Sequence, residues 1–238
     1  LMVLNTVNEF MLKEVHGLGI ARVASLDAEK DRDLVLDIFR KASELGLCGV
    51  SIDEKYGGMG LDFNTGLLFT EGLAGGFSFA TTIGCQTSIG SLPIAWYGTE
   101  EQKAKYLPGI ASGELGASYC LAEPSAGSDL AGLGARAIKD GDEWIVNGQK
   151  VWTSGGHVAD MGMLIARTNP DVPKHQGITW FACDMHQGSA VEIRPLREMT
   201  GEALFNEVFL SDARVEDAAV IGGLHNGWAV ANTTLMFE

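Results

Sequence analysis

A chain of 238 residues, 46% hydrophobic and 20% charged, is long enough for one large domain or two ordinary ones. This is the composition of a globular protein and excludes a disordered chain. The formal net charge of −14 argues against nucleic acids and anionic membranes as general partners, because both need a basic surface.

The sequence predicts neither a membrane span nor a signal peptide. No apolar run approaches the roughly 20 residues that a membrane-spanning helix needs. Residues 1–10 are apolar but lack the basic segment of a signal peptide. The chain has no initiator Met and stops at Glu238 inside an expected helix, so we expect a fragment at both ends.

The chain has four cysteines, which are Cys48, Cys85, Cys120 and Cys183. No two of them form a C-x-x-C pair, and no His/Cys spacing suggests zinc. We therefore expect no metal and interpret the cysteines as buried, reduced thiols, which is typical of a reducing compartment.

The first 110 residues have the pattern of helices. One predicted helical face consists of Leu34, Ile38, Ala42 and Leu45. Gly46 follows them as a signal for the end of the helix. Thr99-Glu100-Glu101-Gln102 is a capping box, and we expect its helix to end near residues 107–109. Residues 62–96 are apolar and rich in small residues, which favours close helix packing, although small residues also let a ligand approach.

From about Leu115 the pattern changes to short strands. They are expected at residues 135–139, 143–146, 149–152, 161–167, 178–184, 191–195 and 207–210. Asp140-Gly141-Asp142 and Asn147-Gly148 are both hairpin signals. Short strands with polar turns predict a sandwich or barrel. Residues 227–238 return to a helical pattern, so the order is helical, then β, then the beginning of a further helical element.

The most informative stretch is residues 119–129, Tyr-Cys-Leu-Ala-Glu-Pro-Ser-Ala-Gly-Ser-Asp. Gly127 and Ser128 supply a flexible backbone and a hydroxyl just after the rigid Glu123-Pro124 step. Such a turn presents backbone N–H groups and a hydroxyl to an anion or to the polar edge of a ring. The stretch therefore predicts a ligand-binding loop.

Five motifs in order resemble those of the acyl-CoA dehydrogenase family. Two lie in the first half, Lys55-Tyr56-Gly57-Gly58-Met59-Gly60 and the segment from Tyr97-Gly98-Thr99 to Tyr106-Leu107-Pro108. The loop at 119–129 and the segment Asn147-Gly148-Gln149-Lys150-Val151-Trp152-Thr153-Ser154-Gly155-Gly156 resemble the flavin-binding middle domain. The fifth runs from Arg197-Glu198-Met199-Thr200-Gly201 to Phe205-Asn206-Glu207-Val208-Phe209. The resemblance covers almost the whole chain.

The resemblance implies an α+β multidomain fold. It consists of an N-terminal α-helical domain at residues 1–114, a middle antiparallel β-barrel or sandwich domain at 115–224, and the start of a C-terminal helical bundle at 225–238.

The resemblance also implies FAD as the cofactor and assigns a role to eight residues. The residues expected to bind FAD are Tyr119, Leu121, Ala122, Gly127, Ser128, Trp152, Thr153 and Ser154. Tyr119, Leu121 and Ala122 would lie along the isoalloxazine ring, and Trp152 would cover one face of it. The Ser154 hydroxyl would contact the ring near N5. Gly127 and Ser128 would lie near the flavin and the CoA phosphates.

Three residues depart from the family pattern. Ser154 stands where the family usually has Thr, so a hydroxyl is kept. Ala122 stands where the family commonly has Thr, so a side-chain hydroxyl is missing and only a backbone N–H remains. Ser125 replaces a Gly, which is tolerable if its φ is negative. Without the other motif residues, each would have a simpler interpretation than a flavin contact. Trp152 alone would be a core aromatic, Ser128 alone a turn residue, and Tyr119 alone a half-buried strand residue.

The implied reaction is α,β-dehydrogenation of an acyl-CoA to the trans-2-enoyl-CoA. A carboxylate with a raised pKa would remove the Cα proton, and a hydride would leave Cβ for flavin N5. In the isovaleryl-CoA and long-chain branches of the family, the base lies where this chain has Glu238. Glu238 is therefore a candidate base, with an exposed helix Glu as the equal alternative. The expected substrate-binding residues are Ser128, Met236, Phe237 and Glu238.

The resemblance implies that electrons pass to an electron-transfer flavoprotein and that the protein acts in fatty acid β-oxidation. It also implies a homotetramer or homodimer, in a bacterial cytoplasm or the mitochondrial matrix. Two alternatives remain open, which are an acyl-CoA oxidase on the same fold and a non-catalytic subunit of a heteromeric enzyme. We expect the fragment to be inactive alone, since the family completes its FAD site with a neighbouring subunit.

Overall fold

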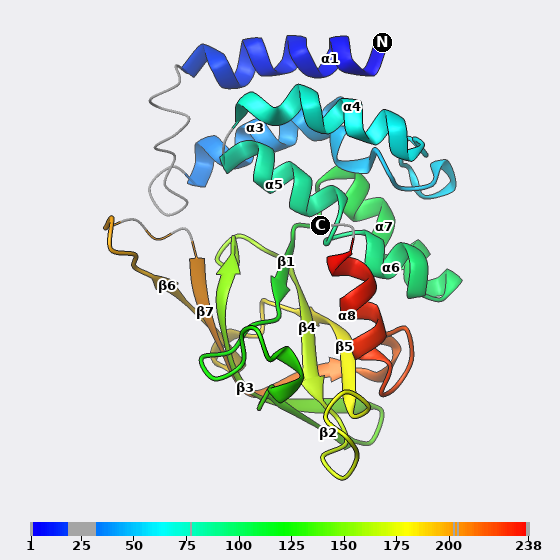
Figure 1. Cartoon of the computed structure of the whole chain (residues 1–238), viewed down its shortest axis with the longest axis vertical. Coiled ribbons are helices and arrows are strands. Elements are labelled where there is room, and N and C mark those ends of the chain that lie inside the picture. Colours follow the sequence, from blue (N-terminus) through cyan, green and yellow to red (C-terminus); the bar gives the residue numbers. More distant parts are fainter. Residues whose placement is uncertain (1, 19–31, 77, 202, 204, 237–238) are drawn as a thin grey trace.

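The computed structural model describes residues 2–18, 32–76, 78–201, 203 and 205–236. A bundle of helices forms one end of the molecule and a β-sheet forms the other, as Figure 1 shows. The last helix of the chain lies beside the sheet and against the first helical part. The predicted order of a helical domain, a β domain and the start of further helical structure is confirmed.

The helices are α1 (Met2–Phe10), α3 (Arg32–Glu44), α4 (Phe63–Leu73), α5 (Ser78–Thr87), α6 (Leu92–Tyr97), α7 (Glu100–Ser112) and α8 (Gly227–Leu235). A π-helical turn at Met11–Val15 extends α1. The helical core includes Val7, Ile38, Phe69 and Phe79. Gly72 packs so closely on α1 that an added Cβ would come within 2.8 Å of the Val7 side chain. Close helix packing by small residues is therefore confirmed there.

The predicted face of α3 is only partly buried. Ile38 and Ala42 are buried, and Gly46 ends the segment with a positive φ of 76°. Leu45 was wrongly assigned to this face, because it follows the end of the helix and is 43% exposed.

Helix α7 begins at the predicted capping box but continues beyond its predicted end. The Thr99 hydroxyl accepts a hydrogen bond from the Gln102 N–H at 3.3 Å, and Gln102 Oε1 accepts one from the Thr99 N–H at 2.9 Å. The helix passes through Pro108 to Ser112, so the expected end near residues 107–109 was wrong. Pro108 and Ala104, four residues earlier, are both exposed, so water can solvate the carbonyl that Pro108 leaves without a donor.

The described strands form one mixed sheet. They are β1 (Ala117–Cys120), β2 (Arg136–Asp140), β3 (Glu143–Ser154), β4 (Met161–Arg167), β5 (Ile178–Asp184), β6 (Val191–Leu196), β7 (Phe205–Glu216) and β8 (Val220–Ile221). Their order is β6-β7-β3-β2-β4-β5-β8, and β1 pairs with β4. Most pairs are antiparallel, as predicted, but β1 and β2 both run parallel to β4. The expectation of a purely antiparallel sheet is corrected accordingly.

One of the two hairpin signals was wrong. The turn at Gly141 joins β2 and β3 as predicted, with Asp140 opposite Glu143. Asn147-Gly148 instead lies inside β3, where the register with β7 shifts as in a β-bulge. The Asn147 side chain bonds Asp212 on β7 twice, at 2.9 Å each. Gly148 is required because a Cβ there would come within 2.5 Å of the Ala135 Cβ.

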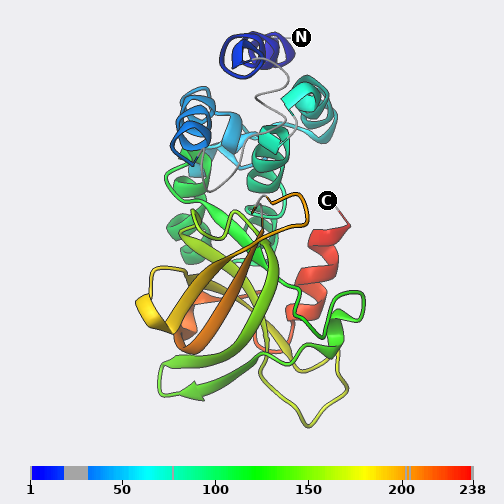
Figure 2. The ribbon, with the colours of Figure 1, turned by 90° about the vertical axis from the view of Figure 1, so that its left-hand side faces the viewer.

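Two buried glutamines join the helices to the sheet. The helical part and the sheet lie end to end in Figure 2. Gln86 Nε2 on α5 donates to the carbonyls of Ile110 and Leu115, and its Oε1 accepts from the N–H of Ala117 on β1. Gln102 Nε2 on α7 donates to the carbonyls of Ala218 and Val220. These bonds fix the helical part relative to β1 at one point and to the start of β8 at another.

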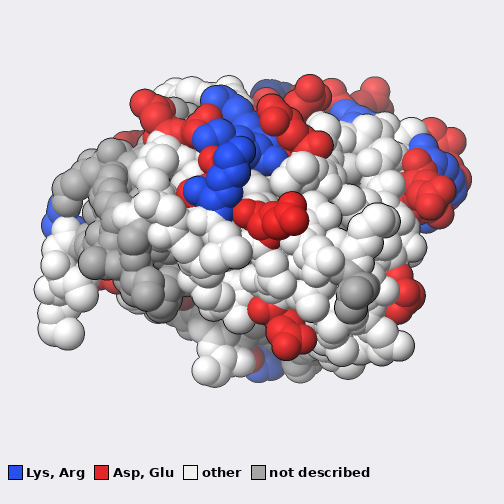
Figure 3. Space-filling model, turned by 90° about the horizontal axis from the view of Figure 1, so that it is seen from above, with Lys and Arg blue, Asp and Glu red and all other residues white. Residues whose placement is uncertain are grey.

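The outer end of the helical part carries exposed apolar side chains, which include Met2, Leu12 and Phe63. Figure 3 looks down on this end and shows a large uncharged area beside intermixed acidic and basic side chains. None of the helices in the described ranges combines the length and the hydropathy that a bilayer crossing requires.

Replacing Gly58 by Ala should lower the free energy of unfolding by about 1–3 kcal/mol, because the added Cβ would collide with the Ile52 carbonyl group. The matched control is Gly66→Ala in α4, where an added Cβ would meet no described atom within 4 Å beyond its neighbours in the helix. That change should raise the free energy of unfolding by about 0.5–1 kcal/mol, because Ala favours a helix over Gly. Urea titrations measure both, and equal effects would contradict the packing of the Gly58 turn.

Candidate functional site

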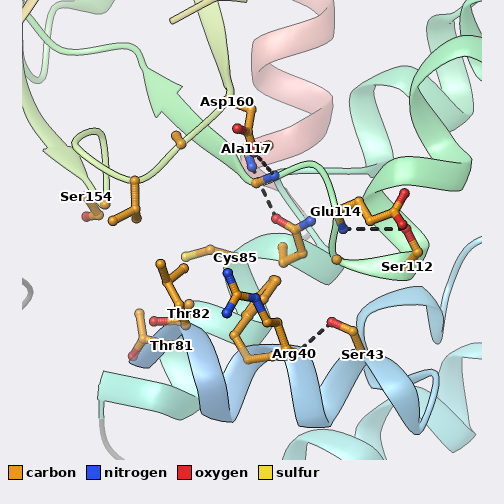
Figure 4. Close-up of a pocket in the computed structure, with 18 of the residues that line it drawn as sticks. Arg40, Ser43, Thr81, Thr82, Cys85, Ser112, Glu114, Ala117, Ser154 and Asp160 are labelled. Atoms are coloured by element: carbon orange, nitrogen blue, oxygen red, sulfur yellow. Dashed lines mark hydrogen bonds between the residues drawn. The ribbon is translucent and has the colours of Figure 1, made fainter. Parts of the chain in front are cut away.

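A cavity of about 790 Å³ lies where the helices meet the sheet (Figure 4). Its walls come from α3, α5, the connection between α7 and β1, and the connection between β3 and β4. The lining side chains that carry polar or charged groups include Arg40, Ser43, Glu44, Thr81, Thr82, Cys85, Glu114, Ser154 and Asp160. Ser154, one of the residues predicted from the motifs, thus lies at the edge of this cavity.

The structure brings together the two sequence segments that carry the predicted flavin residues. Ser118 Oγ donates to the carbonyl of Ser154 at 2.5 Å, and the Val151 N–H donates to the carbonyl of Ala122 at 2.9 Å. The end of β3 therefore runs beside residues 118–122. Tyr119, Leu121 and Ala122 are half-buried along this line.

A buried ion pair fixes this arrangement. Lys150 Nζ lies 2.8 Å from Glu123 Oε1, and the side chains are 0% and 5% exposed. Lys150 Nζ also donates to the Leu121 carbonyl at 3.1 Å. The Glu123 carboxylate accepts from the N–H groups of Gly134 at 2.6 Å and Ala135 at 3.0 Å. The pair therefore joins β3 to both ends of the loop 121–135.

Electrostatics keep the Glu123 carboxylate charged. Burial alone would raise its pKa, but the charge and hydrogen bond of Lys150 and the N–H groups of Gly134 and Ala135 outweigh it and lower the pKa. Burial lowers the pKa of Lys150, and the charge of Glu123 opposes that shift. The sequence analysis assigned no role to either residue. Lys150 takes a buried position in β3, a strand in which buried and more exposed positions mostly alternate.

Trp152 is both exposed and strained. Its side chain is 57% exposed, which excludes the interpretation as a core aromatic. Its φ is +61°, a costly conformation for a bulky residue, and the pairing of β3 with β7 shifts between Lys150 and Thr153. The Phe205 ring packs against it edge-on, with centroids 5.6 Å apart. The backbone therefore holds a large aromatic surface toward solvent.

The loop after Glu123 opens with a tight turn. Glu123 and Ala126 exchange backbone hydrogen bonds at 3.0 and 3.1 Å across Pro124 and Ser125. The φ of Ser125 is not positive, so the replacement of a Gly is tolerated as expected. Gly127 and Ser128 follow, and both are exposed.

Several N–H groups of this loop are available to a ligand. The backbone N–H groups of Ala122, Gly127 and Ser128 make no hydrogen bond to any described residue. The Ser128 and Ser154 hydroxyls likewise donate to no described residue, and Ser154 is exposed. These donors belong to the loop whose first residues run beside the end of β3, the strand that carries Trp152.

The other predicted site residues differ in placement. The Thr153 side chain is fully buried, so only its backbone can face a ligand. Met236 is 74% exposed at the end of α8. Phe237 and Glu238 lie outside the described residues. The roles of these residues stay predictions.

The cysteines are buried as predicted, with one exception. None of the four forms a disulfide, and Cys48, Cys120 and Cys183 are buried, but Cys85 is only half-buried. Burial raises the pKa of Cys120 to about 11 and that of Cys183 to about 12, which keeps both protonated. In the described ranges, no three His, Cys, Asp or Glu side chains are grouped as metal ligands.

Comparisons with known proteins match the chain to one family in both halves. The family model for the acyl-CoA dehydrogenase N-terminal domain matches residues 1–114, and the model for the middle domain matches residues 118–213. The chain belongs to the acyl-CoA dehydrogenase family.

Individual relatives agree with this assignment. Acyl-CoA dehydrogenase FadE34 of Mycobacterium tuberculosis is 49% identical over 145 residues, which are 61% of this chain and 20% of that protein. The structure of an acyl-CoA dehydrogenase complexed with FAD from Bacillus anthracis has a TM-score of 0.87 at 30% identity, over 98% of this chain and 39% of that one. A structure described as the electron transferring flavoprotein of Acidaminococcus fermentans also gives 0.87 at 30% identity, over 98% and 60%.

The chain spans only part of these proteins. The first curated relatives are matched over 20–38% of their own length.

Replacing Lys150 by Met should lower the free energy of unfolding by about 3–5 kcal/mol, because it leaves Glu123 charged and buried without its partner. The double variant Lys150→Met/Glu123→Gln should lose less. The control Lys174→Met removes an exposed ion pair with Asp129 and should cost at most about 1 kcal/mol. Chemical denaturation measures all three, and equal losses for Lys150→Met and Lys174→Met would contradict the role of the buried pair.

The contribution of Glu123 should depend on pH with a definite sign. Its pKa in the folded chain lies below the ordinary 4.5, so its stabilising effect is complete above 4.5 and is lost as pH falls through the folded value. The difference in stability between the wild type and Glu123→Gln should therefore narrow on acidification below 4.5. Denaturation curves across this range test it, and a widening difference would contradict it.

Proposed function

We propose that the protein containing this chain binds FAD and dehydrogenates an acyl-CoA thioester between its α and β carbons. The observation that carries the proposal is the strained, exposed Trp152 on the strand end that runs beside Ala122, together with the unused N–H groups of Ala122, Gly127 and Ser128 in the same loop. Membership of the acyl-CoA dehydrogenase family supports it. The relative from Bacillus anthracis, which is complexed with FAD, supports the cofactor.

The residues present fit a flavin. An isoalloxazine ring needs a flat apolar surface for stacking and donors along its polar edge. The 57% exposed indole of Trp152 offers the surface, and the N–H of Ala122 together with the Ser154 hydroxyl offers donors. Ala122 lacks the hydroxyl common in the family, so its free N–H is the donor that remains.

In this proposal each residue has a binding or positioning role. Trp152 covers one face of the ring, and Ser154 donates a hydrogen bond near N5. Tyr119 and Leu121 bound the ring on the side of β1. When bound, FAD supplies the acceptor for the hydride that leaves Cβ. Thr153 contributes through its backbone, because its side chain is buried.

The substrate side of the proposal involves residues at and beyond the end of α8. We propose that Ser128, Met236 and Phe237 contact the substrate and that Glu238 removes the Cα proton. An exposed helix Glu without a catalytic role is the alternative for Glu238. The proposed acceptor of the electrons is an electron-transfer flavoprotein. The structural neighbour from Acidaminococcus fermentans, which is described as such a protein, supports this proposal. A homo-oligomer and a location in the bacterial cytoplasm or the mitochondrial matrix stay predictions.

The test is anaerobic mixing of the FAD-loaded whole protein with a panel of acyl-CoAs, followed by flavin absorbance. Bleaching by an acyl-CoA is expected. Rapid recovery on readmission of oxygen would identify an oxidase instead of a dehydrogenase. Flavin that binds but is never bleached would contradict the enzymatic proposal and favour a non-catalytic subunit, and failure to bind FAD would contradict the cofactor.

Variants at the two proposed flavin contacts should separate binding from reduction. Trp152→Ala should weaken FAD binding about 2- to 10-fold, because it removes the stacking surface. Ser154→Ala should retain FAD but slow its reduction by acyl-CoA about tenfold, because one hydrogen bond near N5 is lost. Phe63→Ala, at an exposed aromatic on α4, is the control and should change neither. FAD titration and rapid-mixing absorbance provide the readouts, and a Trp152→Ala protein with unchanged FAD affinity would contradict the stacking role.

A further inference from the structure

Arg40 is an exposed, charged side chain in the cavity wall that has no partner among the described residues. Its guanidinium extends from α3 toward the side of α5 that carries Thr82 and Cys85, as Figure 4 shows. It makes no hydrogen bond or ion pair with any described residue. Glu44 and Glu114 also line the cavity, but neither lies within 4 Å of the guanidinium as an ion pair.

The lack of a partner is informative because carboxylates are abundant. The chain has 31 Asp and Glu residues against 17 Lys and Arg. Lys41, the next residue of α3, lies 2.8 Å from Glu14 and 2.9 Å from Asp37. Arg40 projects from another side of the same helix, into the cavity, where its charge remains available to a ligand.

The position of Arg40 relates it to the proposed reaction. The cavity that Arg40 lines also reaches Ser154 and Gly155, at the end of β3 where the reacting edge of the flavin is proposed. An acyl group with its α and β carbons at Ser154 can extend through this space toward α3. Its far end then approaches the guanidinium, so the chemistry of Arg40 bears on the substrate.

We propose that Arg40 selects acyl-CoA substrates whose acyl group carries a second carboxylate at its far end, such as the mono-CoA thioesters of dicarboxylic acids. A guanidinium offers a planar pair of N–H donors that matches a carboxylate in two parallel, charge-assisted hydrogen bonds. An uncharged acyl end would leave the guanidinium without a partner. This inference rests on the proposed dehydrogenation.

The test compares matched pairs of acyl-CoAs that differ only in the terminal group, such as hexanoyl-CoA and adipoyl-CoA, with the FAD-loaded whole protein. Wild type is expected to reduce its flavin with a higher kcat/KM for the carboxylate-bearing member. Arg40→Met should lower that value about 10- to 100-fold and leave the value for the uncharged member nearly unchanged. Arg40→Lys, which keeps the charge but not the fork, should give an intermediate loss.

Binding of the unreactive products provides a second readout. Calorimetric Kd values for the 2-enoyl products should rise in Arg40→Met for the carboxylate-bearing compound alone. The matched control is Lys41→Met, on the same helix but paired with Glu14 and Asp37, which should change neither kcat/KM nor Kd.

Four outcomes would overturn the inference. Equal loss for both members of a pair would show that Arg40 binds a group common to all substrates, such as a CoA phosphate. No effect on either member, or a wild-type preference for uncharged acyl groups, would show that the charge has no role in selection. Failure of every acyl-CoA to reduce the flavin of the wild type would contradict the proposed function itself, and the inference with it.

Discussion

The site depends above all on the buried pair of Lys150 and Glu123. A lysine that is fully removed from water is tolerated only with a charged partner and further hydrogen bonds, and here Glu123 and the Leu121 carbonyl provide both. The same carboxylate is held by the N–H groups of Gly134 and Ala135. One interaction thus joins β3 to both ends of the loop 121–135, which connects β1 to β2, and so brings the proposed flavin residues together.

The backbone that the Lys150–Glu123 pair fixes holds Trp152 in a strained conformation. Two residues after Lys150, the backbone adopts a positive φ that a tryptophan does not favour, and the side chain stays largely in solvent. Such strain persists only where the neighbouring structure fixes both ends of the strained segment. The buried Lys150 on one side and the hydrogen bond between Ser118 and Ser154 on the other provide this support.

The sequence predicted most of the fold, because its signals are local. The capping box at Thr99 and the turn at Gly141 depend on neighbouring residues, and both are present. Asn147-Gly148 was wrongly predicted to be a hairpin turn, because a β-bulge and a hairpin turn use the same residue types. Only the contact of Asn147 with Asp212 on β7 shows that it is a bulge. Lys150–Glu123 and Arg40 could not be predicted, because their partner or cavity comes from segments distant in the chain. The flavin residues came from the family motifs, and their roles stay predictions.

The central claim is that Trp152, Ser154 and the loop at 122–128 form the flavin site, with the cavity beside it for the acyl group. A crystal structure of the whole protein with FAD and an acyl-CoA product tests this most directly. The account predicts the isoalloxazine ring against the Trp152 indole, with Ser154 Oγ and the Ala122 N–H within hydrogen-bond distance of it and the acyl group in the cavity. A flavin bound elsewhere, or an acyl group outside the cavity, would contradict it.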